Sequence, residues 1–332
     1  MTSSATEADW SLGTLLGPAV SGSTGSGCRI GFGAMNPRLV SRRAFLGAAA
    51  VLPVALSAVE PIVHKGPPRL RLSLAAYSFR DDFVKGKDGS PAKMDMLRFL
   101  DFCVENGCDG AELTSYYFED PATDEYLRRV QRHAFLRGVS VSGSAIGNNF
   151  THPAGPDRDK ELALTRQWIA RAAVLGAPHI RVFAGSTKGV SKADAKRHTI
   201  EALEEMGELA GKHGIFLGVE NHGGIVAEAD DLLEIVRSVK NPWVGINLDI
   251  GNFNTADPYG DFVKCAPYTV NVQYKGLMRP KGSKEAVPTD LPRVVKILKD
   301  AGYQGWFVLE YEMPEDPYIK VPALLREMRA AI

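Results

Sequence analysis

The sequence has no surplus of charge of either sign. Its 332 residues include 39 lysines and arginines against 39 aspartates and glutamates, and the pI is near 7.1. A phosphate backbone or an anionic membrane surface attracts proteins with a basic excess, so neither nucleic acid nor a membrane surface is expected as a partner. Hydrophobic residues make up 45% of the chain and charged residues 23%, which excludes a disordered or fibrous protein.

Cysteine is also scarce, with four in the chain. Cys28 lies in an N-terminal segment that is set aside below, which leaves Cys103, Cys108 and Cys265. Three thiols cannot pair completely, and no histidine stands near them at the spacing of a zinc knuckle. We therefore predict that they are small packing residues and form neither a disulfide framework nor a redox centre.

A glycine-rich phosphate turn is absent as well. The first predicted strand is followed by Ser78-Phe79-Arg80, and the pair Gly223-Gly224 lacks the GxGxxG spacing of a dinucleotide site. The absence argues against a doubly wound open sheet, and no nucleotide cofactor is expected.

The N-terminal part has no apolar run of the ~20 residues that a membrane-spanning helix needs. Its most apolar stretch, Gly47 to Ala58, is interrupted by Pro53 and follows Ser41-Arg42-Arg43. Paired arginines, a short apolar run and small residues at its end resemble a twin-arginine export signal, while a buried N-terminal helix is the alternative. We expect residues 1–58 to be a leader and the mature protein to lie in the periplasm or otherwise outside the cytoplasm. No stable membrane anchor is expected after removal of the signal.

Residues 1–34 are rich in Ser, Gly and Thr and show no sustained periodicity. They resemble neither a signal nor a domain. We hypothesise that translation begins at Met35, which would place a compact basic segment directly before the apolar run. N-terminal sequencing of the precursor tests this hypothesis.

Strand-like and helix-like patterns alternate from residue 70 onward, after a linker at residues 59–69. The predicted strands are Leu70–Tyr77, Gly110–Leu113, Val139–Ile146, His179–Ala184, Ile215–Glu220, Val244–Asp249, Thr269–Tyr274 and Trp306–Glu310. Glycines suited to left-handed C-caps follow most of the helical patterns. The predicted helices are Met94–Asn106, Glu125–Arg137, Lys160–Leu175, Ala193–His213, Asp230–Val239 and Leu291–Ala301. This alternation predicts a single-domain (β/α)8 TIM barrel over residues 70–332.

Oxygen-bearing side chains close four consecutive predicted strands. Glu220 ends the fifth, Asp249 the sixth and Glu310 the eighth, and Gln273 lies near the end of the seventh. A lone acidic residue at a strand end is commonly a helix cap, but the C-terminal ends of barrel strands converge at one rim. Three unpaired carboxylates would repel one another there and raise one another's pKa. A divalent cation removes that conflict, and oxygen ligands suit Mn²⁺ or Mg²⁺ better than zinc.

Other polar residues stand near the same strand ends. Side chains alternate between the two faces of a strand, so His222 is expected to share a face with Glu220, and Lys275 with Gln273. The residues expected to bind substrate are His222, Asn252, Lys275, Glu112, Arg181 and Asn148. The alternatives are that His222 only caps the following glycine turn, that Lys275 pairs with a carboxylate, and that the last three are supporting polar groups of the barrel.

Four segments carry a resemblance to a known family. They are Leu217-Gly218-Val219-Glu220-Asn221-His222, Gly245-Ile246-Asn247-Leu248-Asp249-Ile250-Gly251-Asn252, Val270-Asn271-Val272-Gln273-Tyr274-Lys275 and Val308-Leu309-Glu310-Tyr311-Glu312. In order and spacing they resemble the xylose-isomerase-like TIM barrels, which include sugar epimerases, hydroxypyruvate isomerases and inosose dehydratases. The resemblance covers about residues 70–330.

The resemblance implies a ligand set with two departures. In that family Glu, Asp, His and Glu from strands five to eight hold the metal, which implies that Glu220, Asp249 and Glu310 are ligands. Gln273 stands in place of the histidine; its carbonyl oxygen can bind a hard cation and, like neutral histidine, adds no charge. The family's Asp-x-x-His is altered too, because the residue three positions after Asp249 is Asn252, which cannot titrate.

The resemblance also implies the chemistry, which is proton transfer next to a carbonyl group through an enediolate. The metal would polarise the carbonyl, and Glu220 and Glu310 would transfer the protons. We therefore expect an exported metal-dependent isomerase or epimerase of a sugar or keto-sugar. A lyase or hydrolase of oxidised (keto) glycosides and a catalytically weak sugar-binding barrel remain as alternatives. The sequence leaves substrate identity, phosphorylation and oligomeric state open.

Overall fold

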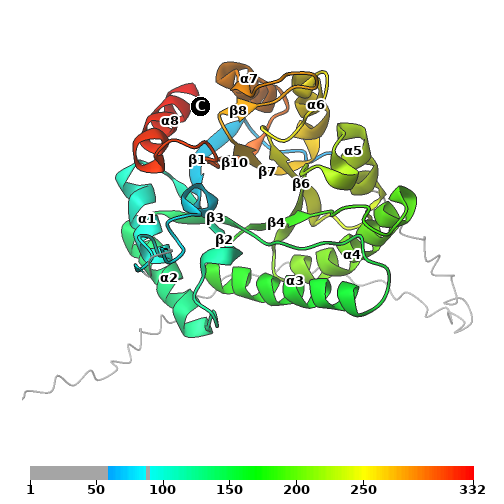
Figure 1. Ribbon diagram of the computed structural model, residues 1–332, viewed down its shortest axis with the longest axis horizontal. Helices are drawn as coiled ribbons and strands as arrows, with labels where there is room; N and C mark the ends of the chain where they lie inside the picture. Colours follow the sequence, from blue (N-terminus) through cyan, green and yellow to red (C-terminus); the bar gives the residue numbers. More distant parts are fainter. Residues whose placement is uncertain (1–58, 87–89) are drawn as a thin grey trace, which may run out of the picture. The chain divides into compact units, whose positions relative to one another are not determined.

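Eight parallel strands close into a barrel in the computed structural model of the protein, which describes residues 59–86 and 90–332 (Figure 1). The barrel strands are β1 (Arg69–Ala75), β2 (Gly110–Thr114), β3 (Ser140–Ala145), β4 (His179–Phe183), β5 (Phe216–Glu220), β6 (Val244–Asp249), β7 (Thr269–Tyr274) and β10 (Gln304–Leu309). They pair in chain order, and β10 closes the barrel on β1 with Arg69 opposite Gln304. The predicted (β/α)8 fold is confirmed. The predicted leader with its export signal lies outside the described residues.

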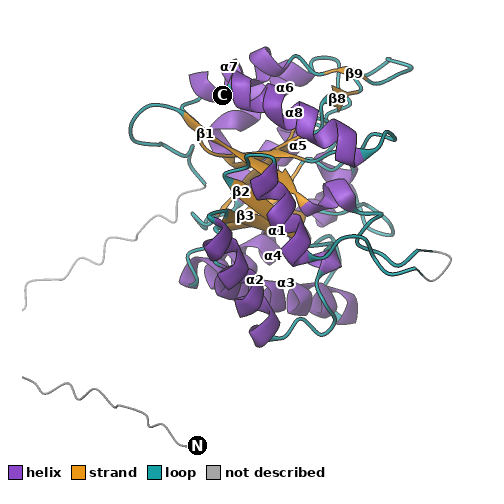
Figure 2. Ribbon diagram, turned by 90° about the vertical axis from the view of Figure 1, so that its left-hand side faces the viewer, coloured by secondary structure: helices purple, strands orange, loops and turns teal. Residues whose placement is uncertain are grey.

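Helices surround the barrel, and each packs against the next along the chain (Figures 1 and 2). Within the described residues they are α1 (Met96–Glu105), α2 (Asp124–Arg137), α3 (Pro156–Leu175), α4 (Lys192–Lys212), α5 (Ala229–Ser238), α6 (Pro258–Cys265), α7 (Leu291–Asp300) and α8 (Pro317–Ala331). The glycines Gly138 and Gly176 end α2 and α3 with φ of 73° and 75°, as a left-handed cap requires. None of the described helices is long and apolar enough to cross a membrane.

Two helices were not predicted from the sequence. The first, α6, has only 8 residues, which is too short to show a helical repeat. The second, α8, carries Pro322 in its interior, and a proline inside a periodic pattern normally marks the end of a helix. Both helices begin with a proline directly after an aspartate N-cap, Asp257 and Asp316 respectively, which is a start signal that the sequence offers.

The first strand ends earlier than predicted. It stops at Ala75, and Ala76–Phe79 form a short 3-10 helix. This turn lifts Tyr77 out of the strand and over the C-terminal rim, where it lines a cavity described below. A second small element, the antiparallel pair β8 (Leu277–Met278) and β9 (Val287–Pro288), is inserted between β7 and α7.

The barrel interior is partly polar. Ser73 on β1 and Ser142 on β3 share a hydrogen bond of 2.7 Å, and Glu112 on β2 contacts Asn271 and Gln273 on β7. Strands β2 and β7 are not neighbours in the barrel, so these bonds cross its interior. The apolar core lies mainly around this centre, and Cys103, Cys108 and Cys265 are free and buried, as expected of packing residues.

Candidate active site

The strand ends bring four of the predicted residues together. Glu220 ends β5, Asp249 ends β6, Gln273 is near the end of β7, and Glu310 directly follows β10. All four are at most 5% exposed. Lys275, two positions beyond Gln273, lies among them.

Several of these side chains face a cavity of about 230 Å³ at the C-terminal end of the strands. Its walls come from six barrel segments and include acids, bases and aromatic rings. The lining residues are Tyr77, Tyr116, Arg181, Phe183, Glu220, His222, Lys275, Glu310 and Glu312. The C-terminal end of a TIM barrel is where such enzymes carry their active sites, so this cavity is the candidate active site.

Glu220 is held by a cation on one side and an amide on the other. The Nε atom of Arg181 lies 2.9 Å from Glu220 Oε2, and the Nδ2 atom of Asn252 donates to Glu220 Oε1 at 2.8 Å. Arg181 also donates to the carbonyl of Ile146 at 2.6 Å and lies over the ring of Phe183. Burial raises the pKa of the Glu220 carboxyl to about 7, although Arg181 opposes the rise. The carboxyl therefore titrates near neutrality.

Lys275 carries the second cation of the site. Its Nζ atom lies 3.1 Å from Asp249 Oδ2, 3.5 Å from Glu310 Oε2 and 3.0 Å from Glu312 Oε2. Burial lowers the pKa of Lys275, but these three carboxylates outweigh it and hold the pKa above its usual value. The side chain is therefore a fixed ammonium group between β6 and β10.

Glu310 differs from Glu220 in its surroundings. Burial raises the pKa of the Glu310 carboxyl well above its usual range; Lys275 opposes this rise, and the nearby carboxylates of Glu220 and Asp249 add to it. Among the described residues Glu310 has no arginine partner, and its Oε1 atom accepts a long hydrogen bond of 3.4 Å from Gln273 Nε2. The surroundings of Glu310 therefore favour the protonated form of its carboxyl, whereas Arg181 favours the ionised form of Glu220.

A chain of amides sets the direction in which Gln273 points. A carboxylate only accepts hydrogen bonds, so the amide nitrogens of Asn271 and Gln273 face Glu112, at 3.0 and 2.8 Å. Asn271 Nδ2 also donates to Asn247 Oδ1, and Asn247 Nδ2 donates to Gln273 Oε1 at 2.6 Å. The Gln273 carbonyl is thus engaged by Asn247, and its amide nitrogen faces Glu310.

The sequence of the barrel matches a known family. The family model of xylose isomerase-like TIM barrels covers residues 100–328. The chain belongs to this family. The rhizopine catabolism protein MocC of Rhizobium meliloti is 26% identical over an alignment of 246 residues, and the match covers 64% of this chain and 72% of MocC.

Two solved structures of similar fold are of interest for the chemistry. The 3-keto-D-glucoside 4-epimerase YcjR from E. coli has a TM-score of 0.63 and 15% identity, over 79% of this chain and 100% of YcjR. The IOLI protein, solved with a zinc atom, has a TM-score of 0.65 and 15% identity, over 79% of this chain and 96% of IOLI. At these identities the likeness shows a shared fold.

The residues of this xylose isomerase-like barrel do not fit a divalent cation at the four predicted ligands. Gln273 presents an amide nitrogen to Glu310 rather than its carbonyl, and a nitrogen that donates hydrogen bonds cannot bind a cation. Lys275 already contacts Asp249 and Glu310. Among the described residues, no group of three or more His, Cys, Asp or Glu side chains is arranged to hold a metal ion. In this arrangement Arg181 and Lys275 provide the positive charge beside the carboxylates at which manganese or magnesium was expected.

The residues predicted to bind substrate divide into four groups. Arg181, Lys275 and His222 line the cavity. Asn252 is half-buried beside it and bridges Glu220 and Asp249 through Nδ2. Glu112 is fully buried below the cavity and does not line it, because its carboxylate is turned into the barrel interior toward the amide chain.

Asn148 belongs to a second cavity of about 300 Å³ beside the first. Its amide pairs with the backbone of Phe183, donating to the carbonyl at 2.8 Å and accepting from the nitrogen at 2.9 Å. Phe183 and His222 line both cavities, and their ring centroids are 4.5 Å apart. These two rings therefore form the wall that the two cavities share.

Some lining residues were missed from the sequence. Tyr77 and Tyr116 sit in short 3-10 turns that follow β1 and β2, and Arg181 forms a hydrogen bond with Tyr116. The position of Glu312, two residues after Glu310, was the available signal, because it has the same parity that singled out Lys275. No comparable pattern marks the two tyrosines.

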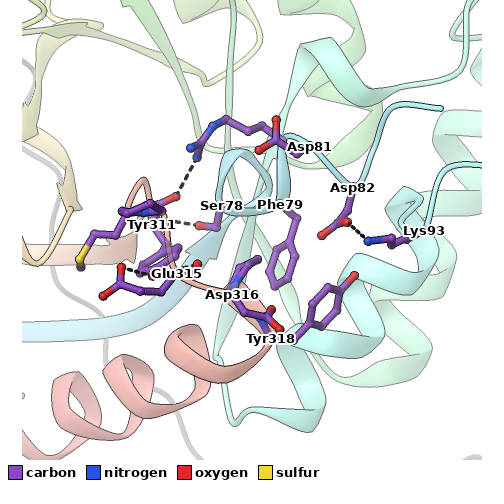
Figure 3. A pocket seen from close by; sticks show the side chains of 13 residues that line it. Ser78, Phe79, Asp81, Asp82, Lys93, Tyr311, Glu315, Asp316 and Tyr318 are labelled. Carbon is purple, nitrogen blue, oxygen red and sulfur yellow. Dashed lines mark hydrogen bonds and ion pairs between the residues drawn. The ribbon is translucent and has the colours of Figure 1, made fainter. Parts of the chain in front are cut away.

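A third cavity, of about 300 Å³, lies on the outer side of the β1 and β10 ends (Figure 3). Ser78 accepts from the backbone nitrogen of Tyr311 there at 2.9 Å, and Lys93 pairs with Asp82 at 3.3 Å. Its other acidic residues, Asp81 and Glu315 among them, are exposed on loops. Solvated carboxylates of this kind are poor proton-transfer groups at neutral pH. The cavity lined by Glu220 and Glu310 is therefore the better candidate for an active site.

Proposed function

We propose that this xylose isomerase-like barrel is a carbohydrate isomerase or epimerase that moves a proton at the carbon next to a carbonyl group. The observation that carries the proposal is the placement of Glu220 and Glu310 in one small cavity with Arg181 and Lys275 beside them. Family membership supports the reaction class, and the fold shared with a keto-glucoside epimerase agrees with it.

The two glutamates take different roles in this proposal. Glu220, ionised beside Arg181, removes the proton from the carbon, and Glu310 begins protonated and delivers a proton. Protonation of the opposite face of the same carbon gives an epimer. Protonation of the former carbonyl carbon, with transfer of the neighbouring hydroxyl proton to the former carbonyl oxygen, gives an isomer. The negative charge that develops on the substrate oxygens is stabilised by the buried cationic groups.

The charge of the cavity favours a neutral substrate. Among the described residues that line it, the lysines and arginines are Arg181 and Lys275, and both already pair with carboxylates. A phosphate group would bring further negative charge to a site that holds Glu220, Glu310 and Glu312, without a free cation to meet it. We therefore place the substrate among unphosphorylated sugars and keto-sugars.

The adjoining cavity favours a second candidate, a lyase acting on keto-glycosides. A glycoside seated with its oxidised ring beside Glu220 would have room for its second unit beyond Phe183 and His222. Removal of the proton next to the ketone would then break the C–O bond one carbon further on, with Glu310 protonating the departing alkoxide. Deuterium in the recovered substrate indicates the epimerase, and a released alcohol indicates the lyase.

We also propose that the protein acts outside the cytoplasm, on the basis of the arginine pair and apolar run before residue 59. Cell fractionation of the wild type beside Arg42→Lys/Arg43→Lys tests this. Retention of the variant in the cytoplasm is expected, and equal distribution of both proteins contradicts it.

The test of the catalytic proposal is proton exchange in D₂O. The purified protein is incubated with a panel of keto-sugars and keto-glycosides, and deuterium next to the carbonyl is followed by NMR. We expect exchange in the wild type and a loss of about 1,000-fold or more in Glu220→Gln and Glu310→Gln. Glu208→Gln is the matched control, because Glu208 is 70% exposed on α4, pairs with Lys212 and lies outside the cavity lining. Binding of sugars without exchange in the wild type would instead indicate a sugar-binding barrel.

A further inference from the structure

The position of Lys275 places a positive charge where several carboxylates converge. Its Nζ atom contacts Asp249 from β6 and Glu310 and Glu312 beyond β10, all within 3.5 Å. Asn252 adds its carbonyl, which accepts from Lys275 at 3.2 Å. The lysine side chain is 11% exposed and lines the cavity, so the same ammonium group meets both the carboxylates and any bound substrate.

The oxygens that a metal ion would need already have donors. Glu220 uses one oxygen for Arg181 and the other for Asn252. Asp249 accepts from the backbone nitrogen of Gly251 at 2.7 Å through Oδ1, and from Asn252 at 2.9 Å through Oδ2. The carbonyl of Gln273 accepts from Asn247. A cation at this point would have to share these oxygens with their donors and would also lie next to an ammonium group, which repels it strongly in a buried site.

We propose that Lys275 takes the place of the divalent cation in this barrel, so that the protein binds and polarises the carbonyl of its carbohydrate substrate without a metal ion. This inference rests on the proposed function for its chemistry. The absence of metal binding is inferred from the contacts of Lys275 and Gln273 and does not depend on the reaction.

A substrate can bind to Lys275 by replacing one of its hydrogen-bond partners. An ammonium group has three N–H donors, and Asp249, Asn252 and Glu312 occupy them in the free protein. Glu312 is the most exposed of its carboxylate partners, at 36%, whereas Asp249 is fully buried. A substrate carbonyl oxygen therefore displaces Glu312 and accepts a hydrogen bond from Lys275, which then stabilises the developing oxyanion.

The test measures metal binding and turnover separately. The wild type, Lys275→Gln and Lys275→Arg are titrated with Mn²⁺ by calorimetry and electron paramagnetic resonance, and their metal content is measured after equal exposure to Mn²⁺, Mg²⁺ and Zn²⁺. Proton exchange is measured with and without EDTA. The matched control is Lys264→Gln, because Lys264 is 48% exposed and lies on α6, outside the cavity lining.

We expect no stoichiometric metal in the wild type and no effect of EDTA on its exchange rate. Lys275→Gln should lose about 100- to 1,000-fold in exchange, and Lys275→Arg, which keeps the charge, should retain more activity and bind no metal. One Mn²⁺ per wild-type chain that is lost in Asp249→Asn would overturn the inference, as would loss of exchange on treatment with EDTA. If Lys275→Gln does not fold, the wild-type titration and the EDTA experiment still show whether the protein binds and needs a metal ion.

The proposed function and this inference fail in different ways. No exchange with any sugar, together with no metal bound by the wild type, contradicts the proposed reaction and the catalytic part of this inference, and it supports only the statement that the site binds no metal. Exchange that depends on Mn²⁺ supports the reaction and contradicts the replacement.

Discussion

The Nε atom of Arg181 lies 2.9 Å from the Oε2 atom of Glu220, and both side chains are at most 4% exposed. The pair joins the ends of β4 and β5 and forms part of the cavity wall. A buried carboxylate without such a partner would hold its proton far above neutral pH. The guanidinium therefore keeps Glu220 available as a base under ordinary conditions.

The pH dependence of activity should report this pair. Only ionised Glu220 can accept a proton, so kcat/KM should fall about tenfold per pH unit below the pKa of Glu220, which burial raises to about 7. On the alkaline side kcat/KM should fall once Glu310 loses its proton. The measurement is kcat/KM for exchange across pH 5 to 10, at about constant ionic strength. An acid limb near the ordinary glutamate value of 4.5 would contradict the assignment.

Replacing Arg181 should shift the acid limb of the kcat/KM profile to higher pH. In Arg181→Met the cation that lowers the pKa of Glu220 is lost, so the acid limb should shift to higher pH and kcat/KM at pH 7 should fall by about 100-fold or more. Arg197→Met, on the exposed face of α4 with 56% of its side chain accessible, is the control. A variant with lower activity but an unmoved limb would show that Arg181 acts on the substrate and does not tune Glu220.

Replacing Gly143 on β3 by alanine should lower the stability of the protein. A Cβ atom there would overlap the imidazole ring of His179 on the neighbouring strand β4, and His179 lies within 3.5 Å of Glu112. Gly143→Ala should therefore destabilise the protein by about 1–3 kcal/mol through overpacking, measured by urea denaturation. Ser140→Ala, at an exposed position of the same strand, should change stability by less than about 0.5 kcal/mol. Equal stability of the two variants would contradict the packing argument.

The buried cysteines should resist alkylation in the folded protein. Burial raises the pKa of the Cys265 thiol to about 12 and that of Cys103 well above its usual value, and the thiolate is the reactive form. Iodoacetamide at about pH 8 should leave both unmodified in native protein and modify both in guanidinium chloride, as read by peptide mass mapping. Rapid native modification of either thiol would show that its segment opens readily.

The fold and three of the acidic residues were predictable because both depend on short-range patterns. Strand parity and the convergence of parallel strand ends place Glu220, Asp249 and Glu310 at one rim without further information. The roles of Gln273 and Lys275 were not predictable in this way. They depend on which rotamer each side chain adopts and on partners far away in sequence, such as Glu112, which is 161 positions from Gln273.

The amide chain below the cavity has a consequence for how such a site changes during evolution. Because Glu112 can only accept, it sets the polarity of every amide between itself and the rim. A neutral residue at position 112 would release that constraint and let the Gln273 amide turn over, so that an acceptor instead of a donor faces Glu310. A mutation inside the barrel would thereby reverse the hydrogen-bonding group that faces Glu310 without altering any residue that lines the cavity.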